Sequence, residues 1–284
     1  LASFGIGCGT QINAIAEVME NNLPFAFPRI AVGIIFGIIT AVVIIGGIKS
    51  IGNVCTKLVP AMGAFYIFGC VVLMVKGHDQ IIPALKLIFH AAFQPTALTG
   101  GILASSMQTA CRYGIARGLF TNEAGLGSAG IAAASARTDN PKRQALISMT
   151  ATFWDTVVMC AITGIVIVMV LVNDPSVAVR YGIGEYTTAA FAALPFGTYL
   201  LGISLIAFAL ATLLGWFYFG EKATDYLFGK KSIKYYQLAY IVMIFIGAIM
   251  SLELVWELTD FINAFMAVPC LIGLICLRNH IKKP

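Results

Sequence analysis

Long apolar segments without a charged residue constrain the fold of this chain most strongly. Residues 30–48, 58–75 and 235–252 contain no charged side chain, and each run is close to the ~20 residues that a helix needs to cross the hydrocarbon core of a bilayer. Charged residues make up 11% of the chain, whereas soluble globular proteins carry roughly 25%. A soluble domain is therefore excluded, and we predict an all-α polytopic membrane protein embedded in the lipid bilayer.

These runs predict about eight crossings within a single transmembrane domain, 1–284. The fourth crossing is expected to be discontinuous, because Gln94-Pro95 and Gly100-Gly101 interrupt its helical pattern. Charged residues between the crossings predict loops or turns over 49–57, 221–234 and 253–260. The predicted crossings are 1–18, 30–48, 58–75, 81–120, 145–172, 198–220, 235–252 and 261–277.

Lys and Arg are distributed unequally between the two predicted faces of the membrane. In multi-pass proteins these residues concentrate in the short cytoplasmic loops. Of the 18 Lys and Arg residues, fourteen fall on one face, and the four on the other are Arg29, Lys76, Lys86 and Arg180. The first face is therefore predicted to be cytoplasmic, with the C-terminus inside and the protein in the plasma (inner) membrane.

The residue patterns argue against an enzyme. The sequence contains no Cys-x-x-Cys pair, Cys/His cluster of metal spacing, phosphate-binding glycine loop or nucleophile–base set. Its seven cysteines are scattered, mostly within apolar runs, where they fit as small packing residues. We therefore expect no catalytic residue, no resident metal and no cofactor. The basic residues lie in short loops between spans, so nucleic acid is not an expected partner.

A stretch of small and polar residues interrupts the apolar pattern at 100–144. If Gly100 and Gly101 break a helix inside the membrane, the half-helix that follows directs free N–H groups at the gap, where transporters hold a substrate and a small cation. Ser105 lies just beyond and can line such a gap, or can hydrogen-bond a neighbouring helix, which is the commoner use. A loop entering an ordinary span, or close packing of helices at the glycines, fits the same residues equally well.

Amides and hydroxyls elsewhere in the spans are further candidates. Gln11 and Asn13 lie in the first segment and can contact a zwitterion or a cation, or can bind a neighbouring helix, which suits Asn13 better. Thr212 and Trp216 are one helical turn apart in a charge-free span. The hydroxyl suits a hard cation or a substrate and the indole can wall a small pocket, although Trp is also common at the membrane interface.

Charged residues at the end of this region form a separate group. They fit either an ion-pair gate on the cytoplasmic side or the anchoring of helix ends, and we favour a pairing of Arg117 with Glu123 or Asp155. The four residues are Arg112, Arg117, Glu123 and Asp155.

Four blocks of the sequence closely resemble the alanine or glycine:cation symporter family. They are FGIGCGTQINAIAE at 4–17, YGIARGLFTNEAGLGSAGIAAASARTDNPKRQ at 113–144, GWFYFGEKATDYLFG at 215–229 and DFINAFMAVPCLIGL at 260–274. The blocks stand in the family's order and cover the chain end to end. The family carries a Gly-Thr-Gly-Asn motif on an earlier broken helix, which would precede Leu1, so we expect the chain to be truncated at its N-terminus.

The resemblance implies the inverted-repeat fold of the leucine-transporter type, with the first helices of the first repeat missing. It also implies import of alanine or glycine coupled to sodium, or to protons in some members. Carried over by matching blocks, Gln11 would contact the substrate, and Thr212 and Trp216 would line the pocket or the neighbouring sodium site. Gly100-Gly101 would match the break in the first helix of the second repeat.

Overall fold

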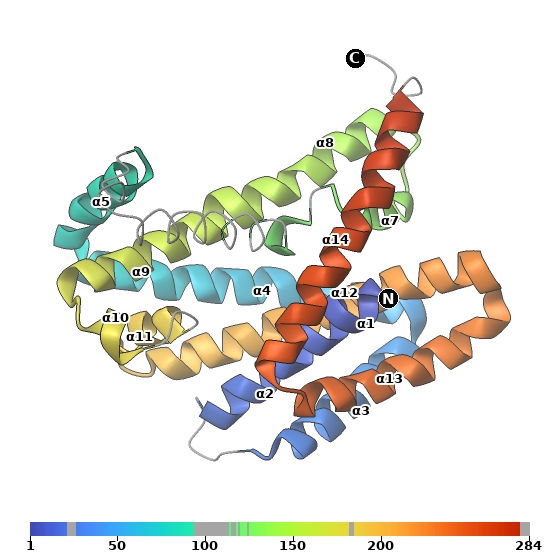
Figure 1. Cartoon of the computed structure of the whole chain (residues 1–284), viewed down its shortest axis with the longest axis horizontal. Coiled ribbons are helices and arrows are strands. Elements are labelled where there is room, and N and C mark those ends of the chain that lie inside the picture. Colours follow the sequence, from blue (N-terminus) through green and yellow to red (C-terminus); the bar gives the residue numbers. More distant parts are fainter. Residues whose placement is uncertain are drawn as a thin grey trace, which may run out of the picture. The chain divides into compact units, whose positions relative to one another are not determined.

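The computed structural model describes residues 1–21, 27–93, 114, 118, 120–123, 125–181 and 185–278. Every regular element among these residues is a helix (Figure 1). The longer elements are α2 (Thr10–Asn21), α3 (Arg29–Ile45), α4 (Gly47–Lys76), α5 (Ile81–Phe93), α8 (Pro141–Thr152), α9 (Ala161–Asn173), α12 (Gly197–Phe228), α13 (Ile233–Ile249) and α14 (Leu252–Leu277). The shorter ones are α1 (Ala2–Phe4), α7 (Ser128–Ala134), α10 (Val177–Arg180), α11 (Tyr186–Phe191), the π-helical segments η1 (Gly5–Gly9) and η4 (Phe153–Cys160), and the 3₁₀ turns η2 (His78–Gln80) and η6 (Lys230–Ser232).

Five helices in the described part of the chain are long and apolar enough to cross a membrane. They are Gly47–Lys76, Pro141–Asn173, Gly197–Phe228, Lys230–Ile249 and Leu252–Leu277, and Arg29–Ile45 is a shorter apolar helix. The prediction of an all-α membrane protein with several spans is thereby confirmed for the described residues. The number of crossings stays a prediction, and most of the discontinuous crossing over 81–120 lies outside the described residues.

Several segments predicted as loops are helical instead. Helix α4 begins at Gly47, so residues 49–57 belong to it, and α12 and α14 likewise include residues 221–228 and 253–260. The break between α3 and α4 lies earlier, at Gly47, whose φ of +67° is in the left-handed region that favours glycine. The turn between α12 and α13 does lie within the predicted loop 221–234, at residues 229–232. Over 49–57 and 253–260 the prediction is wrong, because glycine, Asn or a charge inside a helix costs less than the unpaired backbone groups of a break within a bilayer.

The chain forms two compact units. Unit 1 comprises Leu1–Ala64, Gly125–Ala145 and Gly202–Pro284, and unit 2 comprises Phe65–Ala124 and Leu146–Leu201. The long helices α4, α8 and α12 each contribute residues to both units.

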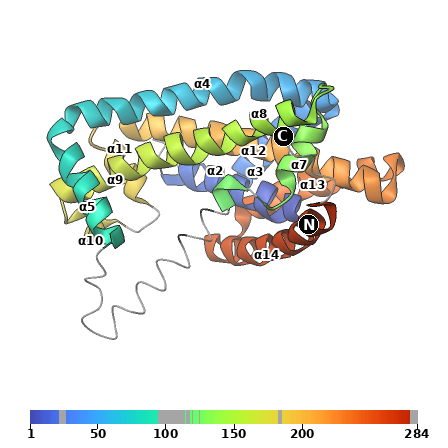
Figure 2. The same cartoon turned by 90° about the horizontal axis from the view of Figure 1, so that it is seen from above.

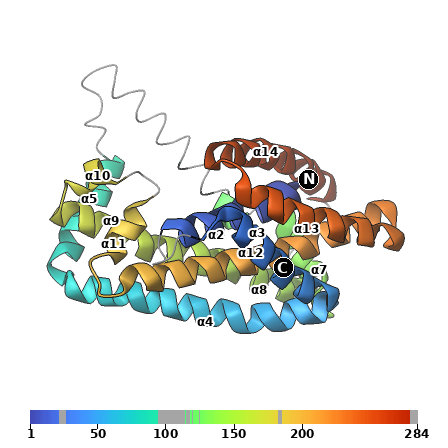
Figure 3. The ribbon, with the colours of Figure 1, turned by 90° about the horizontal axis from the view of Figure 1, so that it is seen from below.

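Unit 1 is organised around the N-terminal segment formed by α1, η1 and α2. This segment packs against α3, α13 and α14, and α13 runs along α3 (Figures 1 and 3). Side chains of the N-terminal segment, α3, α4, α12 and α13 fill the core, including the fully buried Ile12, Leu213, Phe217 and Tyr240. The N-terminal segment therefore lies against helices that come more than 200 residues later in the chain.

Unit 2 gathers short helices at one of its ends. Helix α9 packs against α5, α10 and α11 (Figure 2). The ring of Tyr66 stacks on that of Phe191 with centroids 5.6 Å apart, and its hydroxyl lies 2.7 Å from the Thr163 hydroxyl. Polar and aromatic contacts thus connect α4, α9 and α11 within this unit.

Candidate functional site

A π-helical segment in the middle of the N-terminal helix forms the centre of the candidate site. Residues Gly5–Gly9 adopt this wider helix, and the Thr10 N–H closes it onto the Gly5 carbonyl. Three of its five residues are glycines, which have weak α-helix propensity and expose the backbone to close approach. π-Helical turns occur frequently at functional sites. Ile6, Gly7, Cys8 and Gly9 are all buried.

Trp216 of α12 packs directly on this segment. A Cβ placed on Gly7 would overlap the Cβ and Cγ of Trp216 and would lie 2.8 Å from its Cδ2. The Trp216 ring is 5% exposed and meets Phe219 edge-on at a centroid distance of 5.6 Å. Trp216 is therefore held inside unit 1 and does not sit at its surface, and the missing side chain of Gly7 makes room for it.

Tyr240 of α13 joins the same two helices from the other side. Its hydroxyl donates to the Leu213 carbonyl at 2.8 Å and lies 3.5 Å from the Gly7 carbonyl. Close by, a Cβ on Gly247 would lie 3.0 Å from the Gly9 Cα, so α13 approaches η1 at its backbone. Tyr240 therefore connects α13 to a carbonyl of the π-helical segment η1 and to a carbonyl of α12.

A cavity of about 580 Å³ opens beside Trp216 within unit 1. Apolar side chains dominate its wall, among them Phe219, Ile262 and Phe265. The side-chain hydroxyls that line it belong to Ser3 and Ser128, which are both buried. No charged side chain is among its lining residues. Chemically, this space suits the apolar part of a small molecule.

Gln11 and Thr212 each form a hydrogen bond within their own helix. The Gln11 amide nitrogen donates to the Thr10 hydroxyl at 3.3 Å, and the Thr212 hydroxyl donates to the Phe208 carbonyl at 2.9 Å, one turn back in its own helix. Both side chains are half-buried. Neither lines the cavity beside Trp216. The structure therefore brings Trp216 to the N-terminal segment, but it does not join Gln11, Thr212 and Trp216 in one described cavity.

Comparison with known proteins identifies the chain's relatives. All of its residues, 1–284, match the model of the Sodium:alanine symporter family. The chain belongs to this family. The family is one of symporters, that is, of transport proteins and not enzymes. The five long apolar helices among the described residues agree with a multi-pass membrane protein.

Individual relatives carry names that differ in substrate. The chain is 45% identical over 280 residues to the sodium/alanine symporter AgcS of Methanococcus maripaludis, covering 98% of this chain and 60% of that protein. It is 30% identical to the probable sodium/glutamine symporter GlnT of Bacillus subtilis, covering 98% and 57%. The identity to the sodium/proton-dependent alanine carrier protein of Bacillus sp. strain PS3 is 27%, covering 95% and 63%. The chain thus spans about three fifths of the length of these symporters.

Several residues predicted for the site lie in the part of the chain that the structure does not describe. Gly100, Gly101 and Ser105 lie outside the described residues, as do Arg112 and Arg117. Asn13, by contrast, has the packing role: its amide nitrogen donates to the carbonyls of Gly247 at 3.1 Å and Met250 at 2.7 Å.

A second π-helical segment carries the acid that the sequence singled out within a span. Asp155 lies in η4, and the Thr156 hydroxyl is 3.4 Å from its carboxylate. The Asn122 amide in turn donates to Thr156 at 2.7 Å. Among the described residues, no Lys or Arg forms an ion pair with Asp155, and no three His, Cys, Asp or Glu residues gather as a metal site.

The π-helical segment η1 and its contact with Trp216 were not predicted from the sequence. The alternation Gly5-x-Gly7-x-Gly9 is the signal that could have indicated it, because small residues at close spacing allow another helix to approach. Tyr240 gave no such signal, since its partners are 27 and 233 residues away.

Proposed function

We propose that this protein is a secondary active transporter that carries a small neutral amino acid, alanine or glycine, together with a sodium ion. Membership of the Sodium:alanine symporter family along the whole chain is the observation that carries the proposal. The relative with 45% identity is named a sodium/alanine symporter. A proton is the alternative coupling ion, and one relative bears the name of a sodium/proton-dependent carrier. No cofactor is part of this proposal.

The proposed mechanism is alternating access in a leucine-transporter-type inverted-repeat fold. Sodium and the amino acid bind beside broken helices. Both ligands together stabilise one conformational state more than either ligand does alone, and this couples transport of the amino acid to that of sodium. In this scheme Gln11, Gly100, Gly101, Ser105, Thr212 and Trp216 contact the substrate. The Thr212 hydroxyl is also the proposed ligand of the cation, since hard cations prefer oxygen.

Selection of a short side chain is assigned to Trp216. The indole is fixed between Gly7 and Phe219, so it cannot swing aside for a larger substrate. Rejection then operates through steric overlap, which is a common basis of specificity. The cavity beside the indole supports this placement, because it offers apolar wall and buried hydroxyls but no side-chain charge.

The proposed setting is the plasma membrane, with the C-terminus in the cytoplasm. Fourteen of the 18 Lys and Arg residues fall on the predicted cytoplasmic face, as the positive-inside rule requires. The substrate, the cation and the lipid bilayer are the proposed partners.

Uptake into proteoliposomes tests this function. The complete natural protein is reconstituted, and entry of radiolabelled alanine and glycine is measured with a sodium gradient, with a proton gradient, and with potassium in place of both. We expect concentrative uptake under the sodium gradient. Uptake that is passive and insensitive to any gradient would instead indicate a channel-like pore, and no uptake under any gradient would indicate a non-transporting membrane protein.

Two substitutions test the proposed site separately. Gln11→Ala and Thr212→Ala should each weaken alanine uptake or its sodium dependence while expression stays near normal, because both side chains bond within their own helices. Thr212→Ser retains a hydroxyl and serves as the matched control. Unchanged kinetics and sodium dependence in both alanine variants would remove these residues from the site.

A further inference from the structure

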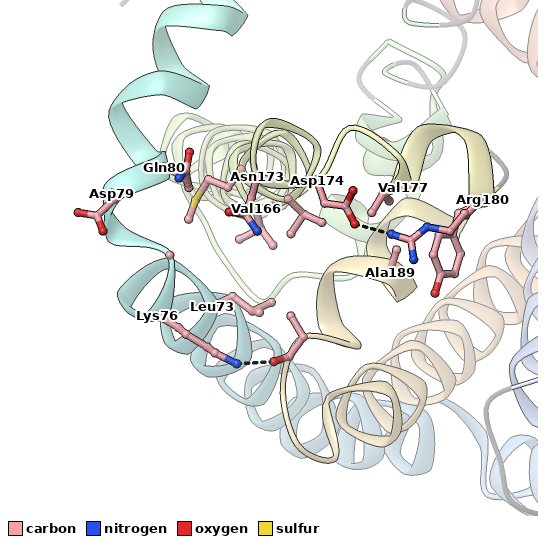
Figure 4. Close-up of a pocket in the computed structure, with 15 residues that line it drawn as sticks. Leu73, Lys76, Asp79, Gln80, Val166, Asn173, Asp174, Val177, Arg180 and Ala189 are labelled. Atoms are coloured by element: carbon pink, nitrogen blue, oxygen red, sulfur yellow. Dashed lines mark hydrogen bonds and ion pairs between the residues drawn. The ribbon is translucent and has the colours of Figure 1, made fainter.

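A second cavity, in unit 2, lies apart from the residues assigned above. Its volume is about 440 Å³, within the ~300–1,000 Å³ typical of small-molecule pockets. It is enclosed by the end of α4, η2, the end of α9, α10 and α11 (Figure 4). The buried side chains of Leu73, Val166, Met169, Val177 and Ala189 line it as an apolar floor.

Charged side chains of both signs line this cavity. Two basic and two acidic side chains line it, namely Lys76, Arg180, Asp79 and Asp174. Asp174 and Arg180 form an ion pair with each other. Asp79 contacts His78 at 3.1 Å, and Figure 4 shows its carboxylate turned away from the cavity. With Asp79 turned away, Lys76 and the Asp174–Arg180 pair present both signs of charge, which a molecule with one positive and one negative group can match.

Lys76 offers the position for the negative group. Its ammonium donates to the Ala193 carbonyl at 2.6 Å, which fixes it at the rim. A lysine ammonium has three N–H donors, so two remain for a ligand. Among the described residues, no acidic side chain forms an ion pair with Lys76.

Asp174 offers the position for the positive group. Its Oδ1 accepts the Ser176 N–H at 3.1 Å and the Ser176 hydroxyl at 2.6 Å, while Oδ2 accepts from Arg180. A carboxylate has about four acceptor positions, so one remains on Oδ2. The Ser176 hydrogen bonds, followed by the Arg180 charge, hold the pKa of Asp174 below its usual range. Figure 4 shows Asn173 and Asp174 across the cavity from Lys76 and Leu73.

From this arrangement we propose that the cavity binds a small zwitterion, with the anionic group on Lys76, the ammonium group on Asp174 and Asn173, and the apolar part on the floor. Two sources supply this chemistry. One is a free neutral amino acid, a case that rests on the proposed function and adds a second binding site to it. The other is the headgroup of phosphatidylethanolamine, whose phosphate and ammonium have the same charges.

The first arm of the test counts bound alanine. The complete protein, purified in detergent, is titrated with radiolabelled alanine at equilibrium, alongside the variants Lys76→Met, Lys76→Arg and Lys86→Met. Lys86 is the matched control, because it lies in α5, is exposed and does not line the cavity. If the ligand is an amino acid, about two alanines bind per protein in the natural protein, in Lys76→Arg and in Lys86→Met, and about one in Lys76→Met.

The second arm measures lipid. The same four proteins are extracted from membranes that contain phosphatidylethanolamine, and the lipid that remains after size-exclusion chromatography is quantified. If the ligand is the lipid headgroup, Lys76→Met retains at most half of the phosphatidylethanolamine that Lys86→Met retains, and the alanine count is the same in all four. Monodisperse elution shows that each variant is folded.

The proposal is overturned if Lys76→Met and Lys86→Met match in both alanine count and retained lipid. Failure of the transport proposal gives a separate result, namely no uptake by the natural protein in proteoliposomes. Binding at the cavity is measured without transport, so either result can stand without the other.

Discussion

The two compact units of this protein differ in what fills them. Unit 1 encloses an apolar and aromatic core that joins its N-terminal segment to α12 and α13, with Ile12, Leu213, Phe217 and Tyr240 fully buried. Unit 2 combines a small apolar floor with a rim of charged and polar side chains at one end. The difference suggests that unit 1 is sensitive to added volume and to lost core hydrogen bonds, whereas unit 2 is sensitive to charge.

The two π-helical segments repeat this contrast. Segment η1 in unit 1 is buried at four of its five residues, contains three glycines and receives an indole. Segment η4 in unit 2 has no buried residue and carries Asp155, a half-buried acid in the middle of a candidate span. The same backbone widening thus accommodates a neighbouring helix in one unit and a polar group in the other.

The largest effect is expected from Gly7→Ala in unit 1. The new methyl group would overlap Trp216, and overpacking of this kind costs about 1–3 kcal/mol or more. The melting temperature of the purified protein should fall clearly. Gly37→Ala is the control, since Gly37 is also buried in unit 1 but has no atom within 4 Å of the added Cβ. Equal melting temperatures for the two variants would contradict the close packing of Trp216 on η1.

A somewhat smaller loss is expected from Asn13→Ala. This change removes two hydrogen bonds and leaves the buried Gly247 carbonyl without its amide donor, while the half-buried Met250 carbonyl keeps a longer bond from Arg29 at 3.5 Å; the loss costs ~1–3 kcal/mol. Gln11→Ala should change the stability by less than ~0.5 kcal/mol, because its hydrogen bond is to the adjacent residue. The melting temperatures of the two variants are compared. A larger decrease for Gln11→Ala than for Asn13→Ala would contradict the packing role of Asn13.

In unit 2, Asp155→Asn should affect activity more than stability. An acid inside a membrane span is expensive and is usually retained for function, and Asp155 has a hydroxyl partner but no ion-pair partner among the described residues. We expect sodium-dependent uptake to fall about tenfold, which corresponds to ~1.4 kcal/mol, while the melting temperature stays the same or rises. Uptake at the natural rate, or a collapse of stability, would show that the acid has a structural role.

The smallest effect is expected from the pH dependence of Asp174. Its pKa is lowered in the folded protein by the Ser176 hydrogen bonds and by Arg180, so the ionised form stabilises the folded state. This contribution is present above the unfolded pKa of about 3.9 and is lost as the pH falls through the lower folded value. The difference in melting temperature between the natural protein and Asp174→Asn should therefore shrink between about pH 6 and pH 2. A difference that is constant over this range would contradict the lowered pKa of Asp174 in the folded protein.

The sequence predicts the helices of this protein better than it predicts their contacts. Uncharged runs such as 235–252 indicate membrane helices because the bilayer requires continuous apolar length, and α13 occupies most of that run. A loop was wrongly predicted near Gly52 and Asn53. These residues break helices in water, but a helix tolerates them inside a bilayer, where no water is present to bond free backbone groups. The burial of Trp216 was the hardest feature to predict. Its neighbours in the sequence are also typical of a Trp at the membrane interface, and the residue that makes room for it, Gly7, lies 209 positions earlier.

The hydrogen bonds of Asn13 have a consequence for biosynthesis. Asn13 and its acceptor Gly247 are 234 residues apart, so the N-terminal segment emerges from the ribosome long before its partner helix exists. At ~5–20 residues per second, the delay is on the order of 10–50 s. During that interval the glycines and the amide of this segment must be sheltered by other helices, lipid or the insertion machinery, and the core of unit 1 closes as one of the last steps of assembly.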